Sequence, residues 1–166
     1  MKTIYLAGGC FWGTQKFFDR FPGVVRTTVG FANGKTENPS YRDVCDRNTG
    51  HAETVKIEFD ETVLSLEKIL NGFFFIIDPF SRNRQGEDVG TQYRTGIYYQ
   101  DPSLFPIIHN RVKREEIKFN RPLAVEVTKL QNFYPAEEYH QKYLDKNPGG
   151  YCHIPLAKMN ADPDQL

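Results

Sequence analysis

Segments with a strand pattern and segments with a helix pattern interleave along this sequence of 166 residues, which limits the folds that it can adopt. Alternating polar and apolar residues predict five strands: Thr3–Ala7, Val24–Phe31, Glu53–Phe59, Thr95–Tyr99 and Leu123–Thr128. In the second strand the alternation places Val25 on the same face as Val29. In the third, the clearest, one face collects Glu53, Val55, Ile57 and Phe59.

Apolar residues at helical spacing predict four helices: one from Cys10 to the break at Pro22-Gly23, then Ser65–Ile76, Ser103–Phe119 and Ala136–Leu144. Because helices and strands interleave while some strands are adjacent in sequence, we expect an α+β fold, a two-layer α/β sandwich with a mixed sheet. We expect one domain over residues 1–166, with an irregular tail at 145–166 that is rich in Pro and Gly.

Composition excludes several classes of protein. Lys and Arg total 21, as do Asp and Glu, so net charge attracts neither nucleic acid nor an anionic membrane. No stretch approaches the ~20 apolar residues of a membrane helix, and the apolar run before Cys10 is shorter than the roughly 7–15 residues of a secretory signal. Cys10, Cys45 and Cys152 form no CxxC pair, so we expect a cytoplasmic protein with neither a disulfide scaffold nor a metal site.

The stretch "AGGCFWG" places Cys10 where a strand turns into a helix. Free N–H groups and the helix dipole favour an anion there, so we expect the pKa of the Cys10 thiol to lie below the value of about 8.5 of a free cysteine. Phe11 and Trp12 would form an apolar wall for a thioether-like group. A buried, inert cysteine beside ordinary core aromatics is the alternative. The space left by Gly8, Gly9 and Gly13 favours a nucleophile.

Glu53 shares its strand face with apolar residues. Because burial disfavours an ionised carboxylate, we expect its pKa to rise, and a carboxylic acid that is neutral near pH 7 can donate a proton to a developing oxyanion. The alternative is a carboxylate that reaches solvent from a frayed strand end. Tyr41 and Tyr93, one in each long polar loop, could orient an oxygen beside Glu53. Asp88 is predicted to position its loop or to contact a partner.

Cys152 follows a Pro-Gly-Gly stretch at 148–150, which can bend and so bring its thiol to a second sulfur. An idle surface thiol is the alternative. Cys45, in a short predicted helix, is interpreted as structural. His51 is interpreted as a residue that fixes its loop, and His153 as a weak influence on the pKa of the Cys152 thiol.

Five short motifs resemble the A-type peptide-methionine sulfoxide reductases in sequence and order: "GGCFWG", "NPSYRDV", "TGHAE", "DVGTQYR" and "KNPGGYC". The resemblance implies a ferredoxin-like sandwich and a monomer that reduces the S epimer of methionine sulfoxide, free or in a protein. Such an enzyme repairs oxidised methionine. It binds no cofactor, and thioredoxin, or dithiothreitol in vitro, supplies the electrons.

The resemblance also implies roles for the matched residues. Cys10 would attack the sulfoxide sulfur and become a sulfenic acid, while Glu53 protonates the sulfoxide oxygen. Cys152 would then form a Cys10–Cys152 disulfide, with Cys45 a bystander. Tyr41 and Tyr93 would hold the oxygen, and the residues expected to bind substrate are Phe11, Trp12, Asp88 and Tyr151.

Two other functions fit parts of the sequence. A cysteine hydrolase or acyl transferase would need a histidine within hydrogen-bond reach of Cys10. A non-catalytic binding module would hold a peptide or a metal with Cys10, Trp12 and Cys152. The chain also departs from the family at Ile77 and Thr95, where histidine and serine are usual, and these departures concern the packing of loops.

Overall fold

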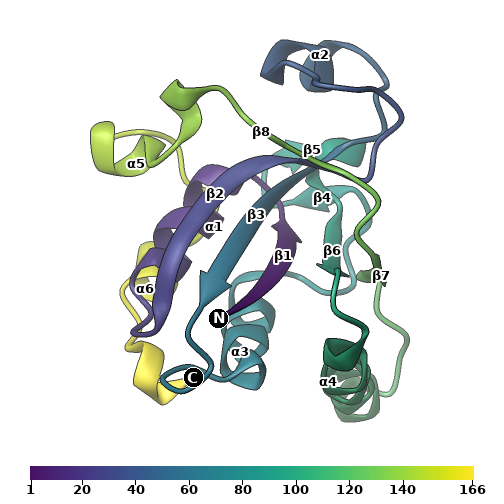
Figure 1. The fold of residues 1–166 in the computed structure, drawn as a ribbon, viewed down its shortest axis with the longest axis vertical. Helices are drawn as coiled ribbons and strands as arrows, with labels where there is room; N and C mark the ends of the chain where they lie inside the picture. Colours follow the sequence, from purple (N-terminus) through teal and green to yellow (C-terminus); the bar gives the residue numbers. More distant parts are fainter.

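Six strands form one mixed sheet in the computed structural model, which describes residues 1–166 (Figure 1). They are β1 (Lys2–Gly8), β2 (Val24–Ala32), β3 (Ala52–Phe59), β6 (Thr95–Tyr99), β7 (Glu126–Lys129) and β8 (Phe133–Pro135). Their order in the sheet is β7-β6-β1-β3-β2-β8. β6 and β7 run parallel and the other neighbours antiparallel. The predicted mixed sheet is therefore confirmed.

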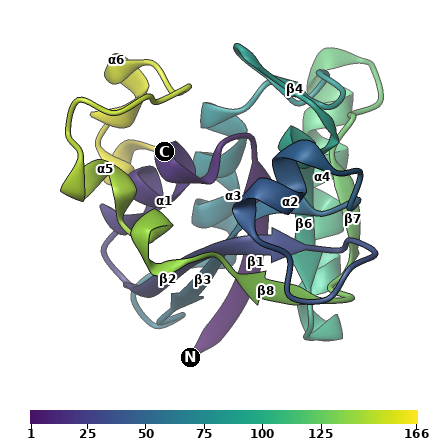
Figure 2. The same cartoon turned by 90° about the horizontal axis from the view of Figure 1, so that it is seen from above.

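Helices cover one face of the sheet, so the predicted two-layer sandwich is also confirmed (Figure 2). α1 (Phe11–Asp19) packs against β2 and β3, while α3 (Leu66–Ile76) packs against β1 and against α4 (Phe105–Phe119). The Ser65 hydroxyl caps α3 by accepting a hydrogen bond from the Lys68 N–H at 3.1 Å. Between the layers lies the main core, which includes Ile4, Leu6, Phe17, Val55, Ile57, Phe73 and Ile97.

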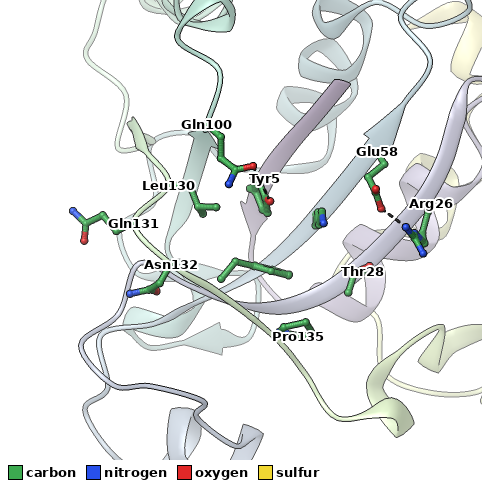
Figure 3. A pocket seen from close by; sticks show the side chains of 11 residues that line it. Tyr5, Arg26, Thr28, Glu58, Gln100, Leu130, Gln131, Asn132 and Pro135 are labelled. Atoms are coloured by element: carbon green, nitrogen blue, oxygen red, sulfur yellow. Dashed lines mark hydrogen bonds and ion pairs between the residues drawn. The ribbon is translucent and has the colours of Figure 1, made fainter. Parts of the chain in front are cut away.

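The opposite face of the sheet is partly open. It carries a second, smaller cluster of Tyr5, Ala7, Ala32, Ala52 and Tyr98, on which Leu130 and Phe133 pack. This face has a cavity of about 530 Å³, and its lining includes Arg26 and Glu58, which form an ion pair at 2.9 Å. Figure 3 shows the side chains that line it. None of the residues that the sequence assigns to a site lines this largest cavity. Glu53 instead shares its face of β3 with Val55 and Ile57, which belong to the main core under the helices.

Most predicted strands match the structure to within one residue at each end, but β7 begins at Glu126 instead of Leu123. β8 is a strand that the sequence pattern did not predict. The expected placement of Val25 on the same face as Val29 is wrong, because a bulge between Val24 and Arg26 interrupts the alternation and leaves Val25 59% exposed, whereas Val29 is fully buried.

The predicted helix Ala136–Leu144 is wrong. A single 3-10 turn, Glu138–His140, is followed by Lys142 in a left-handed conformation (φ +56°) and by the short α5 (Tyr143–Lys146). The reason lies in Gln141, whose side-chain amide donates to the Val29 carbonyl and accepts from the Val29 N–H, both at 2.9 Å. This side chain pairs with β2 as a strand backbone would, and the bond competes with a continuous helix.

The loops carry short elements that frame the site. α2 (Tyr41–Asp46) lies in the first long polar loop, and the hairpin of β4 (Arg84–Gln85) and β5 (Asp88–Val89) lies in the second. The tail after residue 145 is mostly irregular, as predicted, apart from α6 (Leu156–Met159) and a 3-10 turn, Pro163–Gln165. None of the helices has the length and apolar content needed to cross a membrane.

Candidate active site

Cys10 lies where β1 ends and α1 begins. Gly9 makes the preceding turn with φ +86°, a conformation that glycine adopts without strain. Cys10 is the N-cap residue of α1, and its side chain makes no capping hydrogen bond. Cys10 as a whole is only 6% exposed, so its thiol is uncommitted and lies in an enclosed position.

The pKa of the Cys10 thiol is raised well above its ordinary value, so the expectation of a lowered pKa is wrong. Burial is the largest cause and the Glu53 carboxyl is the next, whereas the nearby backbone N–H of Trp12 lowers the pKa. The helix start does favour the anion, but removing the thiolate from water costs more. The resting protein therefore holds a thiol at neutral pH.

Glu53 is buried beside Cys10, with 1% of its surface exposed, so it does not reach solvent from the strand end. Its Oε1 accepts a hydrogen bond from the N–H of Phe11 at 3.1 Å, while Oε2 is buried without a partner. Burial raises the pKa of Glu53 to about 8. At neutral pH the carboxyl therefore keeps its proton, and it has one unpartnered oxygen at the start of α1, where Cys10 lies.

Tyr41 and Tyr93 lie near this carboxyl. The N–H of Tyr41 donates to Glu137 at 3.0 Å, which attaches the start of α2 to the segment after β8. The pKa of both phenols is raised, first by burial and then by Glu53, so both are protonated donors near the same acid. Cys45, one helical turn after Tyr41, has an exposed side chain.

Trp12 and Phe11 form an aromatic floor next to Cys10. Trp12 is half-buried and stacks on Tyr143 with ring centroids 3.8 Å apart. Phe11 is 1% exposed and packs against Phe31 at 5.6 Å. Trp12 thus keeps a partly open surface, and Phe11, which is fully buried, also packs against His140 with ring centroids 5.5 Å apart.

His140 also belongs to this aromatic group, although sequence reasoning missed it together with Tyr143. Its Nδ1 accepts a hydrogen bond from the Trp12 indole N–H at 3.0 Å, and its ring centroid lies 4.3 Å from that of Tyr41. Burial lowers the pKa of His140, which keeps the ring neutral. The aromatic-rich segment "FYPAEEYHQKY" was a usable signal, but the wrong helix prediction there concealed it.

The tail brings Cys152 to the same region. All three cysteines are free, and the Cys152 thiol donates to the Ile154 carbonyl at 3.6 Å. A Cβ atom added to Gly13, three residues after Cys10, would lie 2.8 Å from the sulfur of Cys152, so the tail lies against the first turn of α1. Tyr151 donates to Asp88 at 3.1 Å, which connects the tail to β5.

The hydrolase alternative requires a histidine that hydrogen-bonds to Cys10. None of the histidines does so. His51 pairs with the Thr36 carbonyl at 2.8 Å and fixes its loop, while the Nε2 of His153 donates to the Gly8 carbonyl. His140 faces Trp12. No group of three or more His, Cys, Asp or Glu side chains is arranged to hold a metal ion.

Comparison with known proteins agrees with this arrangement. A family described as peptide methionine sulfoxide reductase matches residues 2–165. The peptide methionine sulfoxide reductase MsrA of Lachnoclostridium phytofermentans is 57% identical over 153 residues, which is 92% of each chain. The MsrA of Clostridium acetobutylicum is 54% identical over 155 residues, 93% of this chain and 96% of that one.

Solved structures give the same result. Reduced Mxr1 from Saccharomyces cerevisiae superimposes with a TM-score of 0.87 at 38% identity, covering 93% of this chain and 91% of that chain. Methionine sulfoxide reductase A of Corynebacterium diphtheriae superimposes with a TM-score of 0.81 at 36% identity, covering 93% and 82%. Both the sequence and the fold therefore lead to one conclusion: the chain belongs to the peptide methionine sulfoxide reductase family.

Proposed function

We propose that this protein reduces the S epimer of methionine sulfoxide, free or within a protein, to methionine, with Cys10 as the nucleophile. The observation that carries the proposal is the buried Glu53 carboxyl, which has one oxygen bound to the N–H of Phe11 and the other unpartnered. Removal of the sulfoxide oxygen needs both a nucleophile at sulfur and a proton donor at oxygen. Cys10 and Glu53 supply these two groups side by side.

The substrate would bind with its methyl group against Trp12, above Phe11. The half-buried indole is held by the Tyr143 stack and by the His140 hydrogen bond, so its face is fixed before substrate arrives. Contacts between sulfur and aromatic rings contribute ~0.3–1.5 kcal/mol each. The sulfoxide oxygen would then point toward Glu53, where Tyr41 and Tyr93 hydroxyls hold it.

In the first step, the Cys10 sulfur attacks the sulfoxide sulfur as Glu53 donates its proton to the oxygen. Hydrogen bonding of the oxygen to the Glu53 carboxyl makes the substrate sulfur more electrophilic, which favours attack despite the raised pKa of Cys10. The sulfur–sulfur bond formed by the attack and the sulfur–oxygen bond of the substrate then break, the hydroxyl passes to the Cys10 sulfur as a sulfenic acid, and methionine leaves. The thiol proton of Cys10 replaces the proton that Glu53 has donated. The two electrons gained by the substrate come from the Cys10 sulfur.

In the second step, Cys152 attacks the sulfenic acid, water leaves and a Cys10–Cys152 disulfide forms. Thioredoxin then reduces this disulfide in the third step. Cys152 lines an open cavity of about 420 Å³, with Leu144, Pro148, Leu156 and Met159, whereas Cys10 is buried. A protein reductant would therefore reach Cys152 first. Asp88 and Tyr151 would hold the tail during these steps. We also propose that the protein is cytoplasmic and monomeric.

The proposal is tested with separated epimers of methionine sulfoxide and dithiothreitol as the reductant. We expect the protein to convert the S epimer to methionine in many turnovers and to leave the R epimer unchanged, since the methyl group and the oxygen must meet Trp12 and Glu53 at once. Methionine is measured by chromatography. Equal rates with both epimers, or no methionine from either, would contradict the proposal.

Cys152→Ser is expected to keep the first step and to block recycling by thioredoxin. One methionine should form per protein molecule, because Cys10 can still accept the oxygen but no second thiol displaces it. The measurement compares methionine formed without reductant with turnover in the presence of thioredoxin. Cys45→Ser is the matched control and should cycle normally, because its side chain is exposed and lies on α2. Normal cycling of Cys152→Ser would instead assign the second step to Cys45.

A further inference from the structure

The tail that carries Cys152 is attached to the turn that carries Cys10, and no step of the proposed reaction uses this attachment. The Nε2 of His153 donates to the carbonyl oxygen of Gly8 at 2.9 Å. Gly8 lies two residues before Cys10, and His153 directly follows Cys152. One hydrogen bond therefore links the two segments whose sulfur atoms have to meet.

Two glycines make room for this contact. A Cβ atom at Gly13 would lie 2.8 Å from the sulfur of Cys152 and 3.3 Å from the side chain of Ile154. A Cβ atom at Gly9 would lie 3.1 Å from the Nε2 of His153. These distances are shorter than ordinary van der Waals contacts. Residues 152–154 fit against Gly8, Gly9 and Gly13 because no side chain intervenes, and we call this contact the tail seat.

We propose that the tail seat positions the second step of the reaction: His153 and Gly13 hold Cys152 where its thiol meets the sulfenic acid of Cys10. This inference rests on the proposed function, in which Cys152 forms the disulfide. In that step the sulfur–sulfur bond forms, the sulfur–oxygen bond of Cys10 breaks, and hydroxide leaves with the thiol proton of Cys152 as water. His153 and Gly13 are positioning residues, since neither takes part in this exchange.

The structure of the tail explains why Cys152 requires a contact that holds its thiol in place. Gly150 packs against Tyr143 and Leu144, but a Cβ atom at Gly149 would meet no atom within 4 Å, so the tail is open to solvent at Gly149. The hydrogen bond from Tyr151 to Asp88 holds the chain only before Cys152, so without a second contact after Cys152 the thiol would have a lower effective concentration at its target. The hydrogen bond of His153 and the close approach at Gly13 supply that contact one residue from the reacting sulfur.

The test is a single turnover of the full-length protein with S-methionine sulfoxide and without reductant. Methionine formation and the loss of free thiols are followed separately, and dimedone traps the sulfenic acid. In the wild-type protein we expect two thiols to be lost soon after methionine forms. In His153→Leu, methionine should form at the same rate, but thiol loss should slow by roughly 3- to 10-fold, the effect of one net hydrogen bond. Trapped sulfenic acid should increase accordingly.

Two further variants separate positioning from a general loss of structure. His153→Gln keeps an N–H donor at the place of Nε2 and should restore fast thiol loss. Gly13→Ala should slow thiol loss at least as much as His153→Leu, although alanine favours the helix more than glycine does. Gly149→Ala is the matched control and should behave as the wild type.

The outcomes distinguish this inference from the function on which it rests. If the wild-type protein forms methionine without losing two thiols, the proposed disulfide step is wrong, and the tail seat with it. If the wild type loses two thiols and His153→Leu and Gly13→Ala do so at the same rate, only the tail seat is wrong. A failure of His153→Gln to restore the rate would also overturn the positioning role of the hydrogen bond.

Discussion

Cys10→Ser is expected to abolish the formation of methionine from methionine sulfoxide, with dithiothreitol as well as with thioredoxin. The substrate can lose its oxygen only to a group that accepts it and supplies two electrons, and a serine hydroxyl does neither. The remaining groups, Glu53 and the aromatic floor, still bind and polarise the sulfoxide. The loss should therefore appear in kcat, with binding of the substrate retained.

The fold of Cys10→Ser should be intact, because serine is nearly isosteric and is a favoured helix N-cap residue. The Cys10 side chain caps nothing in α1, so the exchange removes no hydrogen bond from the helix. Cys45→Ser removes one thiol from an exposed position and should keep full activity. The measurements are methionine formation, substrate binding and the thermal midpoint. Methionine production by Cys10→Ser above the uncatalysed rate would remove Cys10 from its role as nucleophile.

The order and type of most elements follow from the sequence because the apolar side of each pattern is the side that the fold buries. The face of β3 with Val55, Ile57 and Phe59 is fully covered by helices, so its alternation is clear. The errors arise where one local feature outweighs the pattern. A bulge turns Val25 outward, and the side chain of Gln141 pairs with β2 and interrupts the predicted helix.

The candidate site was predictable only in part. The motifs around Cys10, Glu53 and Cys152 are continuous in sequence, and the fold brings these residues together. The partners of Trp12 are not predictable in this way, because His140 is 128 positions away and meets the indole only through the irregular course of the chain after β8. The pKa of Cys10 was predicted in the wrong direction, since its burial depends on side chains from several distant segments.

Glu53→Gln is expected to slow methionine formation by about 10²–10⁴-fold, the usual contribution of a general acid. The amide oxygen of the introduced glutamine can still accept the hydrogen bond from the N–H of Phe11, and its NH₂ group can still contact the sulfoxide oxygen. Binding should therefore change little, while proton transfer is lost. Glu58→Gln is the matched control, because Glu58 lies on the same strand, faces the open side of the sheet and pairs with Arg26.

The pH dependence gives a second signature of the acid. The reacting form needs a thiolate on Cys10 and a proton on Glu53, whose pKa is raised to about 8. Below pH 8 the single-turnover rate should rise with the thiolate fraction. Above pH 8 the loss of the Glu53 proton cancels further gain, and the wild-type profile should become flat. In Glu53→Gln no such cancellation occurs, so the slow rate should continue to rise.

The stability of Glu53→Gln separates the loss of an acid from damage to the core. Because the folded-state pKa of Glu53 is raised from 4.5 to about 8, the wild-type protein loses stability as pH rises between these values. A neutral amide has no proton to lose, so the thermal midpoint of Glu53→Gln should equal or exceed that of the wild type at pH 7. A variant that is stable, binds substrate and is slow shows that the carboxyl acts on the sulfoxide oxygen. An unchanged single-turnover rate, or a profile that still becomes flat near pH 8, would assign the proton to another group, and the buried carboxyl would then have no part in the reaction.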